Sequence, residues 1–201
     1  DSEPGSYLYC GLSRDASKEE ILERINNNTI TDILNKIEVK AGEVVMVKAG
    51  TIHAIGAGVF ICEIQQNSNC TYRMYDYDRR DKFGNPRELH VKKALDVVDN
   101  HKYIKDNKTE VVIARNEHFT EERLVQCKYF EVYKYDVNDE AKITVDEASF
   151  VSVLFINGSG TIETDDYEKT MEFKAGDSFF VSAGLRSIII KVQATIVVTR
   201  V

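Results

Sequence analysis

The residues best suited to chemistry lie in a sequence unit that occurs twice. Residues 39–56 read VKAGEVVMVKAGTIHAIG, and residues 173–189 read FKAGDSFFVSAGLRSII. Each copy places Lys-Ala-Gly and an acid before an apolar run, and Ala-Gly before a hydrophobic strand. His53 of the first copy is replaced by Ser187 in the second. A lone histidine on a strand is ordinarily a core residue. The serine of the second copy shows, however, that the repeated unit accepts a simple polar group at this position. The imidazole in the first copy is therefore a candidate metal ligand.

Arg73 is the second candidate. It lies in the sequence TYRMYDYD of residues 71–78. If this segment is a strand, Arg73 shares one face with Tyr75 and Tyr77, while the aspartates lie on the other face. A guanidinium directed into a barrel then needs an anionic partner. The alternative is an arginine whose tip reaches solvent past the rim.

Glu63 is the third candidate, in the apolar run VFICEIQQ of residues 59–66. A carboxylate flanked by Cys62 and Ile64 is expected to be buried, and burial suits a carboxylate to act as a base near neutral pH. The alternative is a structural ion pair inside the barrel, with Arg73 itself as a possible partner. Gln65 shares the face of Glu63.

Other polar residues are expected to have structural roles. His90 is interpreted as a helix-start residue and His118 as exposed in a connection. The charged run DYDRRDK, residues 76–82, is expected to be a solvated turn, with phosphate binding as the alternative.

Composition narrows the functional classes. The 201 residues carry a net charge of −7, which argues against a protein that binds nucleic-acid phosphates. No apolar run is long enough to cross a membrane, and the pattern of a secretory signal peptide is not seen. The cysteines, scattered without C-x-x-C spacing, are expected to be reduced thiols in a cytoplasmic protein; they are Cys10, Cys62, Cys70 and Cys127.

The elements that must position these residues are mostly strands. Short β-branched and aromatic runs joined by glycine-containing turns indicate a sandwich or barrel, and the repeat indicates two of them. Helices are expected only within an insertion at 17–36, which opens with the capping box Ser-Lys-Glu-Glu, and at 88–99. The predicted organisation is an incomplete first barrel over 1–100, a connection over 101–123 and a second, structural barrel over 124–201.

The repeated unit resembles the second motif of the cupin superfamily, whose small jelly-roll barrels hold a metal between two sheets. Residues 49–99 resemble, more specifically, the short bacterial class of type I mannose-6-phosphate isomerases. The motifs are Ala-Gly-Thr-Ile-His-Ala-Ile-Gly, Glu-Ile-Gln-Gln-Asn-Ser, Thr-Tyr-Arg-Met-Tyr-Asp, and Arg-Glu-Leu-His before a helix. The resemblance implies a mainly β fold of tandem cupin barrels. It also implies a zinc ligand at His53, an active-site arginine at Arg73 and a candidate proton-transfer base at Glu63.

The implied function is part of a zinc-dependent isomerase that interconverts mannose 6-phosphate and fructose 6-phosphate through an enediol. The family's other zinc ligands come from a Gln-x-His-Pro box and a later glutamate, and neither motif is found in this sequence. Because catalytic zinc usually takes three protein ligands, the chain alone is expected to bind zinc weakly and to be inactive. The alternatives are a non-enzymatic sugar-binding regulatory cupin and a different metal-dependent cupin enzyme. The expected partners are the sugar phosphates, with no nucleic acid and no membrane, and self-association is expected through the open edge of the first barrel.

Overall fold

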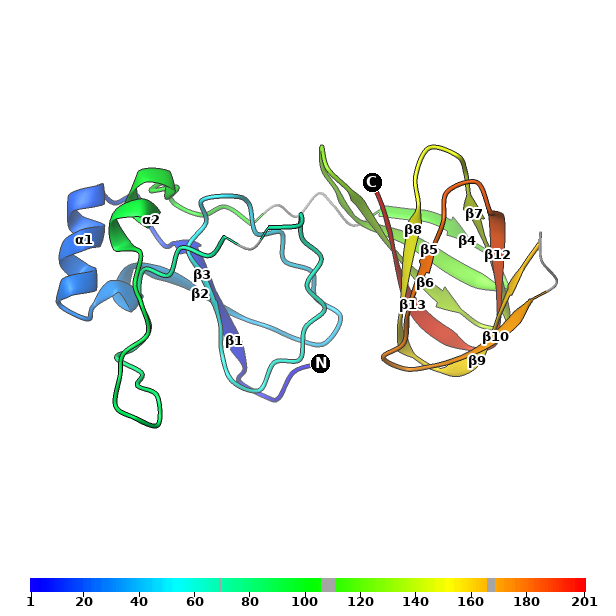
Figure 1. Cartoon of the computed structure of the whole chain (residues 1–201), viewed down its shortest axis with the longest axis horizontal. Coiled ribbons are helices and arrows are strands. Elements are labelled where there is room, and N and C mark those ends of the chain that lie inside the picture. Colours follow the sequence, from blue (N-terminus) through cyan, green and yellow to red (C-terminus); the bar gives the residue numbers. More distant parts are fainter. Residues whose placement is uncertain (69, 106–110, 166–168) are drawn as a thin grey trace. The chain divides into compact units, whose positions relative to one another are not determined.

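A computed structural model describes residues 1–68, 70–105, 111–165 and 169–201 (Figure 1). The chain divides into two compact units, one ending at Lys105 and the other comprising the rest of the chain. No helix in the described residues is long and apolar enough to cross a membrane.

The second unit is a two-layered jelly roll. Its four-stranded sheet has the order β10-β9-β12-β7, and its six-stranded sheet the order β11-β8-β13-β6-β5-β4. All of the strand pairings are antiparallel. The strands are β4 (Val111–Arg115), β5 (Phe119–Gln126), β6 (Glu131–Val137), β7 (Glu140–Val145), β8 (Val151–Asn157), β9 (Ser159–Thr164), β10 (Thr170–Lys174), β11 (Ser178–Val181), β12 (Arg186–Lys191) and β13 (Ala194–Arg200).

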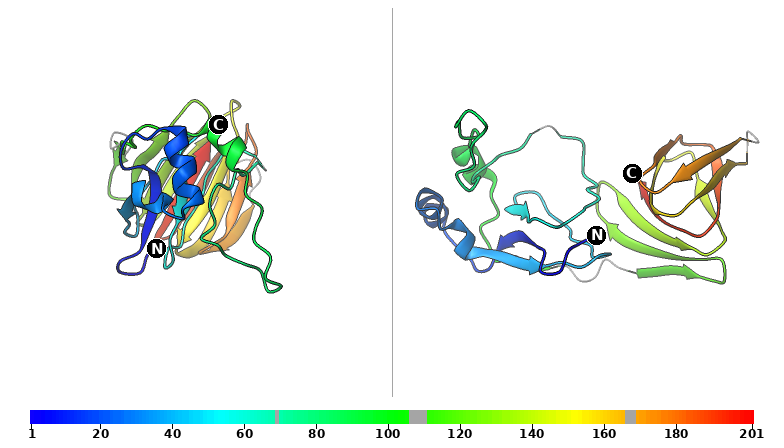
Figure 2. Two further views of the ribbon diagram at one scale, coloured as in Figure 1. Left: turned by 90° about the vertical axis from the view of Figure 1, so that its left-hand side faces the viewer. Right: turned by 90° about the horizontal axis from the view of Figure 1, so that it is seen from below.

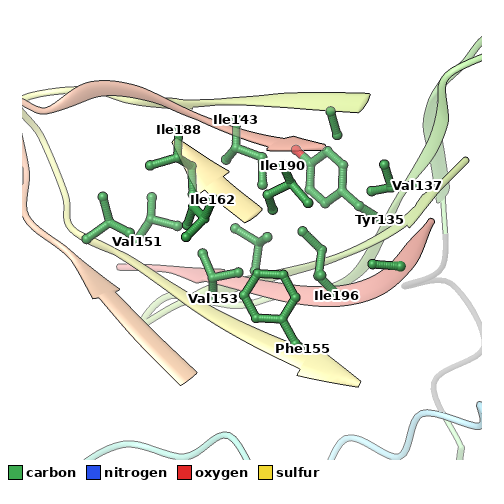
Figure 3. Close-up of a cluster of buried hydrophobic side chains, with 14 of the residues drawn as sticks. Tyr135, Val137, Ile143, Val151, Val153, Phe155, Ile162, Ile188, Ile190 and Ile196 are labelled. Carbon is green, nitrogen blue, oxygen red and sulfur yellow. The ribbon is translucent and has the colours of Figure 1, made fainter. Parts of the chain in front are cut away.

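Alternating apolar side chains fill the space between these two sheets. In β7, every second residue is buried, and β8 and β13 show the same period of two. Phe155 is fully buried, and its ring stacks on Phe173 with centroids 3.6 Å apart. Figure 3 shows the apolar side chains converging from both sheets. The interior of this barrel is therefore a packed hydrophobic core.

The first unit contains a three-stranded sheet of order β2-β1-β3, with β1 at Tyr7–Leu12, β2 at Leu34–Glu38 and β3 at His53–Ile55. The antiparallel order β10-β9-β12 in the second unit is the same arrangement. The two copies of the sequence unit thus follow corresponding strands, β2 and β10, and lead into β3 and β12. The helical insertion lies between β1 and β2.

The turns of the repeated unit are also alike in detail. Gly42 and Gly176 have φ values of 85° and 90°, in the left-handed region that glycine adopts without steric cost. The backbone N–H of Lys40 donates to the Glu43 carboxylate at 3.2 Å, and the N–H of Lys174 donates to Asp177 at 2.9 Å. The acid of the repeat therefore closes the same turn in both copies.

The insertion predicted at 17–36 is helical as expected, but its helical part ends at Ile33, where β2 follows. Ser17 caps α1 (Lys18–Asn26) by accepting a hydrogen bond from the N–H of Glu20 at 3.1 Å. A 3₁₀ turn follows at Ile30–Ile33. The second helix, α2, spans Val91–Val97 instead of 88–99, and His90 is its N-terminal cap residue, as predicted. The two helices lie side by side, and Lys18 Nζ donates to the carbonyl oxygen of Asp96 at 3.3 Å (Figures 1 and 2).

Three expected strands of the first unit are not formed. Residues 43–48, 60–66 and 71–76 have no strand assignment, and Figure 2 shows this part of the chain as extended irregular loops. Their apolar patterns predicted strands, but none of the three segments pairs with a neighbouring strand among the described residues. A strand without a partner leaves its backbone groups unsatisfied, so pattern alone does not create one.

The segment 101–123, predicted as a connection, is largely strand where the structure describes it. Residues 111–115 form β4, and β5 begins at Phe119, so both extend the six-stranded sheet of the second unit. The part of that segment at residues 106–110 lies outside the described residues. The second unit therefore includes more of the chain than the range 124–201.

Candidate functional site

His53 is the first residue of β3 and is exposed. Its Nδ1 atom lies 3.0 Å from the carbonyl oxygen of Thr51. Because a carbonyl oxygen only accepts hydrogen bonds, Nδ1 must carry the proton in this contact, which leaves the lone pair on Nε2. A histidine whose Nδ1–H donates to a backbone carbonyl is a common arrangement for metal ligation through Nε2. The tautomer of His53 therefore suits the role predicted for it.

His53 lies directly opposite Cys10 of β1, so the two side chains share one face of the sheet. Cys10 is fully buried, and burial raises the pKa of its thiol. This cysteine is therefore a neutral neighbour near pH 7 and not a thiolate ligand. In the described residues, no cluster of three or more histidine, cysteine or acidic side chains could hold a metal ion.

Arg73 is partly buried beside the start of α2. Its backbone N–H donates to Nδ1 of His90 at 3.3 Å, and its Nη1 donates to the carbonyl oxygen of Glu88 at 3.2 Å. The segment is not a strand, yet the exposure still alternates, because Met74 and Asp76 are buried while Arg73 is only partly so. Within the described part of the chain Arg73 forms no ion pair. Its positive charge is therefore available to an anion.

Glu63 is exposed, so the expectation that it is buried was wrong. The reason is that residues 60–66 pair with no strand in the described structure, and their apolar side chains do not enclose the carboxylate. Phe60 is 82% exposed and Ile61 is 43% exposed. The alternative of an ion pair between Glu63 and Arg73 is not found among the described residues either.

The three candidates are thus not joined to one another by any hydrogen bond or ion pair in the described structure. All three lie in the first unit: His53 begins β3 of the three-stranded sheet, and Glu63 and Arg73 lie in the irregular segments that follow β3. Gln65 is exposed in the same loop as Glu63. The structure therefore gives the surroundings of each group separately, and their assembly into one site stays a prediction.

The second copy of the repeat uses its serine for structure. Ser187 is buried, and its hydroxyl group donates a hydrogen bond to the Asp165 carboxylate, which also pairs with Lys142 at 2.8 Å. These hydrogen bonds lower the pKa of Asp165. The hydroxyl of Ser187 is therefore committed to holding β12 near the end of β9.

The sequence did not predict a cluster of charged residues formed by Asp76, Arg79 and Arg87. Asp76 is buried, and its Oδ1 accepts from Arg79 at 2.8 Å and from Arg87 at 3.5 Å. The segment was expected to be a solvated turn, and the arginines are indeed exposed, but the buried carboxylate between them was not anticipated. The signal in the sequence was that Asp76 alternates in step with the apolar Met74, which is also buried.

A group of tyrosines lies next to this cluster. The rings of Tyr75 and Tyr77 are 4.9 Å apart, and those of Tyr7 and Tyr9 are 5.4 Å apart. Partial burial, followed by the proximity of Tyr9 and Tyr7, raises the pKa of Tyr77. The phenol of Tyr77 is therefore a neutral hydrogen-bonding group over the whole physiological range.

The remaining predicted residues behave as expected. His118 is exposed in the turn between β4 and β5, and its Nδ1 donates to Asp139 at 2.9 Å, which raises the pKa of the imidazole. All four cysteines are free: Cys10 is buried, Cys62 and Cys70 are exposed, and Cys127 is partly buried.

Comparison with known proteins adds to this description. Residues 120–201 match the family model of the mannose-6-phosphate isomerase cupin domain. The chain is 40% identical over 190 residues to "Putative mannose-6-phosphate isomerase YvyI" of Bacillus subtilis, which covers 92% of this chain and 57% of the relative. It is 34% identical over 179 residues to mannose-6-phosphate isomerase ManA of the same organism, which covers 84% of this chain and 52% of ManA.

The structural comparison extends over the whole chain. The crystal structure of the mannose 6-phosphate isomerase from Bacillus subtilis matches with a TM-score of 0.89 at 35% identity, and the match covers 100% of this chain and 62% of the other. The chain thus spans little more than half the length of the curated relatives it matches. On these grounds, the chain belongs to the cupin-fold family of mannose-6-phosphate isomerases.

Proposed function

We propose that this chain is part of a mannose-6-phosphate isomerase that interconverts mannose 6-phosphate and fructose 6-phosphate. The observation that carries the proposal is the match to the Bacillus subtilis enzyme structure along the entire chain. The reaction moves a proton between two neighbouring carbons of the sugar through an enediol. It needs a group that holds the proton and a cation that stabilises the enediolate.

Arg73 and Glu63 are the groups of this chain proposed for those two tasks. Arg73 is without a carboxylate partner in the described residues, and the hydrogen bond from its Nη1 to the Glu88 carbonyl limits the motion of its guanidinium. A fixed cation facing the enediolate stabilises the charge that develops there. Glu63, exposed in its loop, is proposed to carry the proton.

Zinc is the proposed cofactor, with His53 as one ligand through Nε2. The hydrogen bond from Nδ1 to Thr51 fits this role. The described residues do not otherwise fit a catalytic zinc site, because such a site usually takes three protein ligands and no such cluster is present among them. We therefore assign no catalytic step to the metal, and we expect the 201-residue chain alone to be inactive.

A chimera tests the proposal. The matched segment of Bacillus subtilis ManA is replaced by this chain, and the conversion of mannose 6-phosphate is followed by a coupled assay. We expect isomerase activity in the chimera and a loss of at least a hundredfold with Arg73→Ala, on the scale of removing a preorganised charge-stabilising group. A folded chimera that contains zinc but converts no mannose 6-phosphate contradicts the proposal.

A non-enzymatic sugar-binding cupin is the second candidate, and the lack of a complete ligand cluster in the described residues favours it. It predicts that the chain binds sugar phosphate while the zinc-loaded chimera remains inactive. Under the first proposal, binding and turnover occur together in the chimera.

The cellular and molecular setting is also proposed. Four free cysteines support a location in the reducing cytoplasm. The edge strands β2 and β3 support self-association, because an uncovered edge presents unpaired backbone groups to another chain. A single monomer mass in light scattering at all concentrations contradicts the self-association.

A further inference from the structure

The buried carboxylate of Asp76 holds two exposed arginines. Its side chain is only 7% exposed, whereas the side chains of Arg79 and Arg87 are 63% and 52% exposed. Both guanidinium groups contact the same oxygen, Oδ1, at 2.8 and 3.5 Å. The second oxygen, Oδ2, is buried and has no hydrogen-bond partner in the described structure. One carboxylate therefore brings two cations together at the surface.

The charges around this pair do not cancel. Arg79 and Arg87 contribute two positive charges against the single negative charge of Asp76. The neighbouring acids are engaged elsewhere: Asp78 pairs with Arg80 at 2.9 Å, and Asp81 accepts hydrogen bonds from the backbone amides of Phe83 and Asn85 at 2.8 and 2.9 Å. An excess of one positive charge remains on the two guanidinium groups.

The backbone fixes this arrangement. Tyr77 and Asp78 have φ values of 55° and 51°, a left-handed conformation that costs non-glycine residues about 1 kcal/mol or more each. The turn is closed by the N–H of Arg79, which donates to the Asp76 carbonyl at 3.0 Å, while Arg79 Nε lies 3.4 Å from the same oxygen. The guanidinium of Arg79 also lies 5.6 Å from the centroid of the Tyr77 ring. Arg79 is thus held by four contacts and is preorganised.

We infer that Arg79 and Arg87, oriented by Asp76, bind the phosphate group of the substrate. A guanidinium presents parallel N–H donors that match the oxygens of a phosphate monoester, and two such groups suit its charge of nearly −2. The exposed ring of the neighbouring Tyr77 offers apolar contact to a sugar attached to that phosphate. The inference rests on the proposed function, since it names the substrate group that this cluster recognises.

Arg80 supplies a matched control. It is adjacent in sequence to Arg79 and is 52% exposed, like Arg87, but it is paired one-to-one with Asp78 and bonded to the carbonyl oxygen of Gly84 at 3.2 Å. Its charge is therefore already balanced. Replacement of Arg80 removes the same formal charge from the same loop without removing a member of the proposed pair.

Titration calorimetry of inorganic phosphate, and separately of mannose 6-phosphate, into the 201-residue chain at constant ionic strength tests the inference. We expect Arg79→Gln and Arg87→Gln each to weaken the binding of both ligands about tenfold, as expected for loss of a charge-assisted contact. Arg80→Gln should change the affinity less than twofold. Arg87→Lys should recover part of the loss, because it retains the charge without the fork. Circular dichroism verifies that each variant is folded.

Equal loss in the Arg80 and Arg87 variants, or no phosphate binding by the unaltered chain, overturns the inference. The same substitutions in the ManA chimera separate it from the proposed function. An active chimera whose KM for mannose 6-phosphate is unchanged by Arg87→Gln overturns the phosphate site while leaving the isomerase proposal intact. Phosphate binding that depends on these arginines, together with an inactive chimera, overturns the isomerase proposal while leaving the phosphate site intact.

Discussion

Nδ1–H of His53 donates a hydrogen bond to the carbonyl oxygen of Thr51, with 3.0 Å between the nitrogen and the oxygen. This contact selects the imidazole tautomer in which Nε2 is the basic atom. It ties the proposed ligand to the turn of the repeated unit, because Thr51 follows the Ala-Gly pair that precedes β3. The carbonyl group of Thr51 in this turn therefore leaves Nε2 of His53 free of a proton and able to bind a metal ion.

His53→Ala should weaken zinc binding by the chain about tenfold or more, on the scale of removing a ligand or its support. The exposed position implies a change in unfolding free energy of less than about 0.5 kcal/mol. Zinc titration with a competing chromophoric chelator measures the affinity. His101→Ala is the control, because that side chain is 78% exposed and paired with Asp99. Equal zinc affinity of the His53 variant and the unaltered chain contradicts the ligand role.

Phe155→Ala should destabilise the second unit by about 3–5 kcal/mol, because it removes a fully buried ring from a close-packed core. Amide hydrogen exchange in β8 and β13 gives the free energy of opening for this unit alone. Phe180→Ala should cost less than about 1 kcal/mol, because that ring is 70% exposed. Similar losses in the two variants would mean that the core is loosely packed.

Tyr135 makes the stability of the second unit sensitive to alkali. Burial, and then the 2.6 Å hydrogen bond to Glu121, raise the pKa of its phenol above the ordinary value of 10.0. The unfolded chain releases this proton above about pH 10, whereas the folded chain retains it. The contribution of Tyr135 to the free energy of unfolding is therefore fully present below about pH 10. It is lost as the pH rises further, by about 1.4 kcal/mol per pH unit for one such group.

Tyr135→Phe should reduce that slope by the contribution of one group, as measured by the pH dependence of unfolding between pH 9.5 and 11.5. It should also lower stability at pH 7 by about 1–2 kcal/mol, because Glu121 loses its donor. An unchanged alkaline slope in the variant would show that other groups account for it.

The corresponding glycines Gly50 and Gly184 should respond differently to alanine. Both have positive φ values, 84° and 80°, so each substitution carries the left-handed penalty of about 1–2 kcal/mol. A Cβ at Gly50 would also lie 2.7 Å from the carbonyl oxygen of Val97, whereas at Gly184 the nearest atom is 3.8 Å away. Thermal melts of each unit should show the larger loss for Gly50→Ala. Equal losses would place the whole cost in the backbone angle.

The sequence was sufficient to predict the core strands of the second unit, but not where that unit begins, and it was insufficient for much of the first unit. The period of two in β7, β8 and β13 reports directly which residues face the core, so those strands follow from side-chain type. Residues 60–66 show similar apolar content, yet they form no strand because strand formation depends on a neighbour that local sequence does not specify. The wrong expectation of a buried Glu63 follows from that same error.

The candidate site was predictable in part for related reasons. The contrast between His53 and Ser187 came from comparing two copies of one unit, and the structure shows that the copies have corresponding turns. The pairing of Arg79 and Arg87 through Asp76 was missed. A run of alternating charges looks the same in sequence whether its members are solvated or share a buried partner.

The filled interior of the second barrel limits how its repeat could ever be converted to new chemistry. Replacing Ser187 with histidine would restore the residue type of the first copy, but the space between the two sheets, where a metal would have to lie, is already filled by packed apolar side chains. A second metal site in this barrel would first require a cavity, made by replacing buried residues such as Phe155 and Ile190 with smaller ones. Since each truncation of this kind costs several kcal/mol, loss of the fold would compete with gain of the ion.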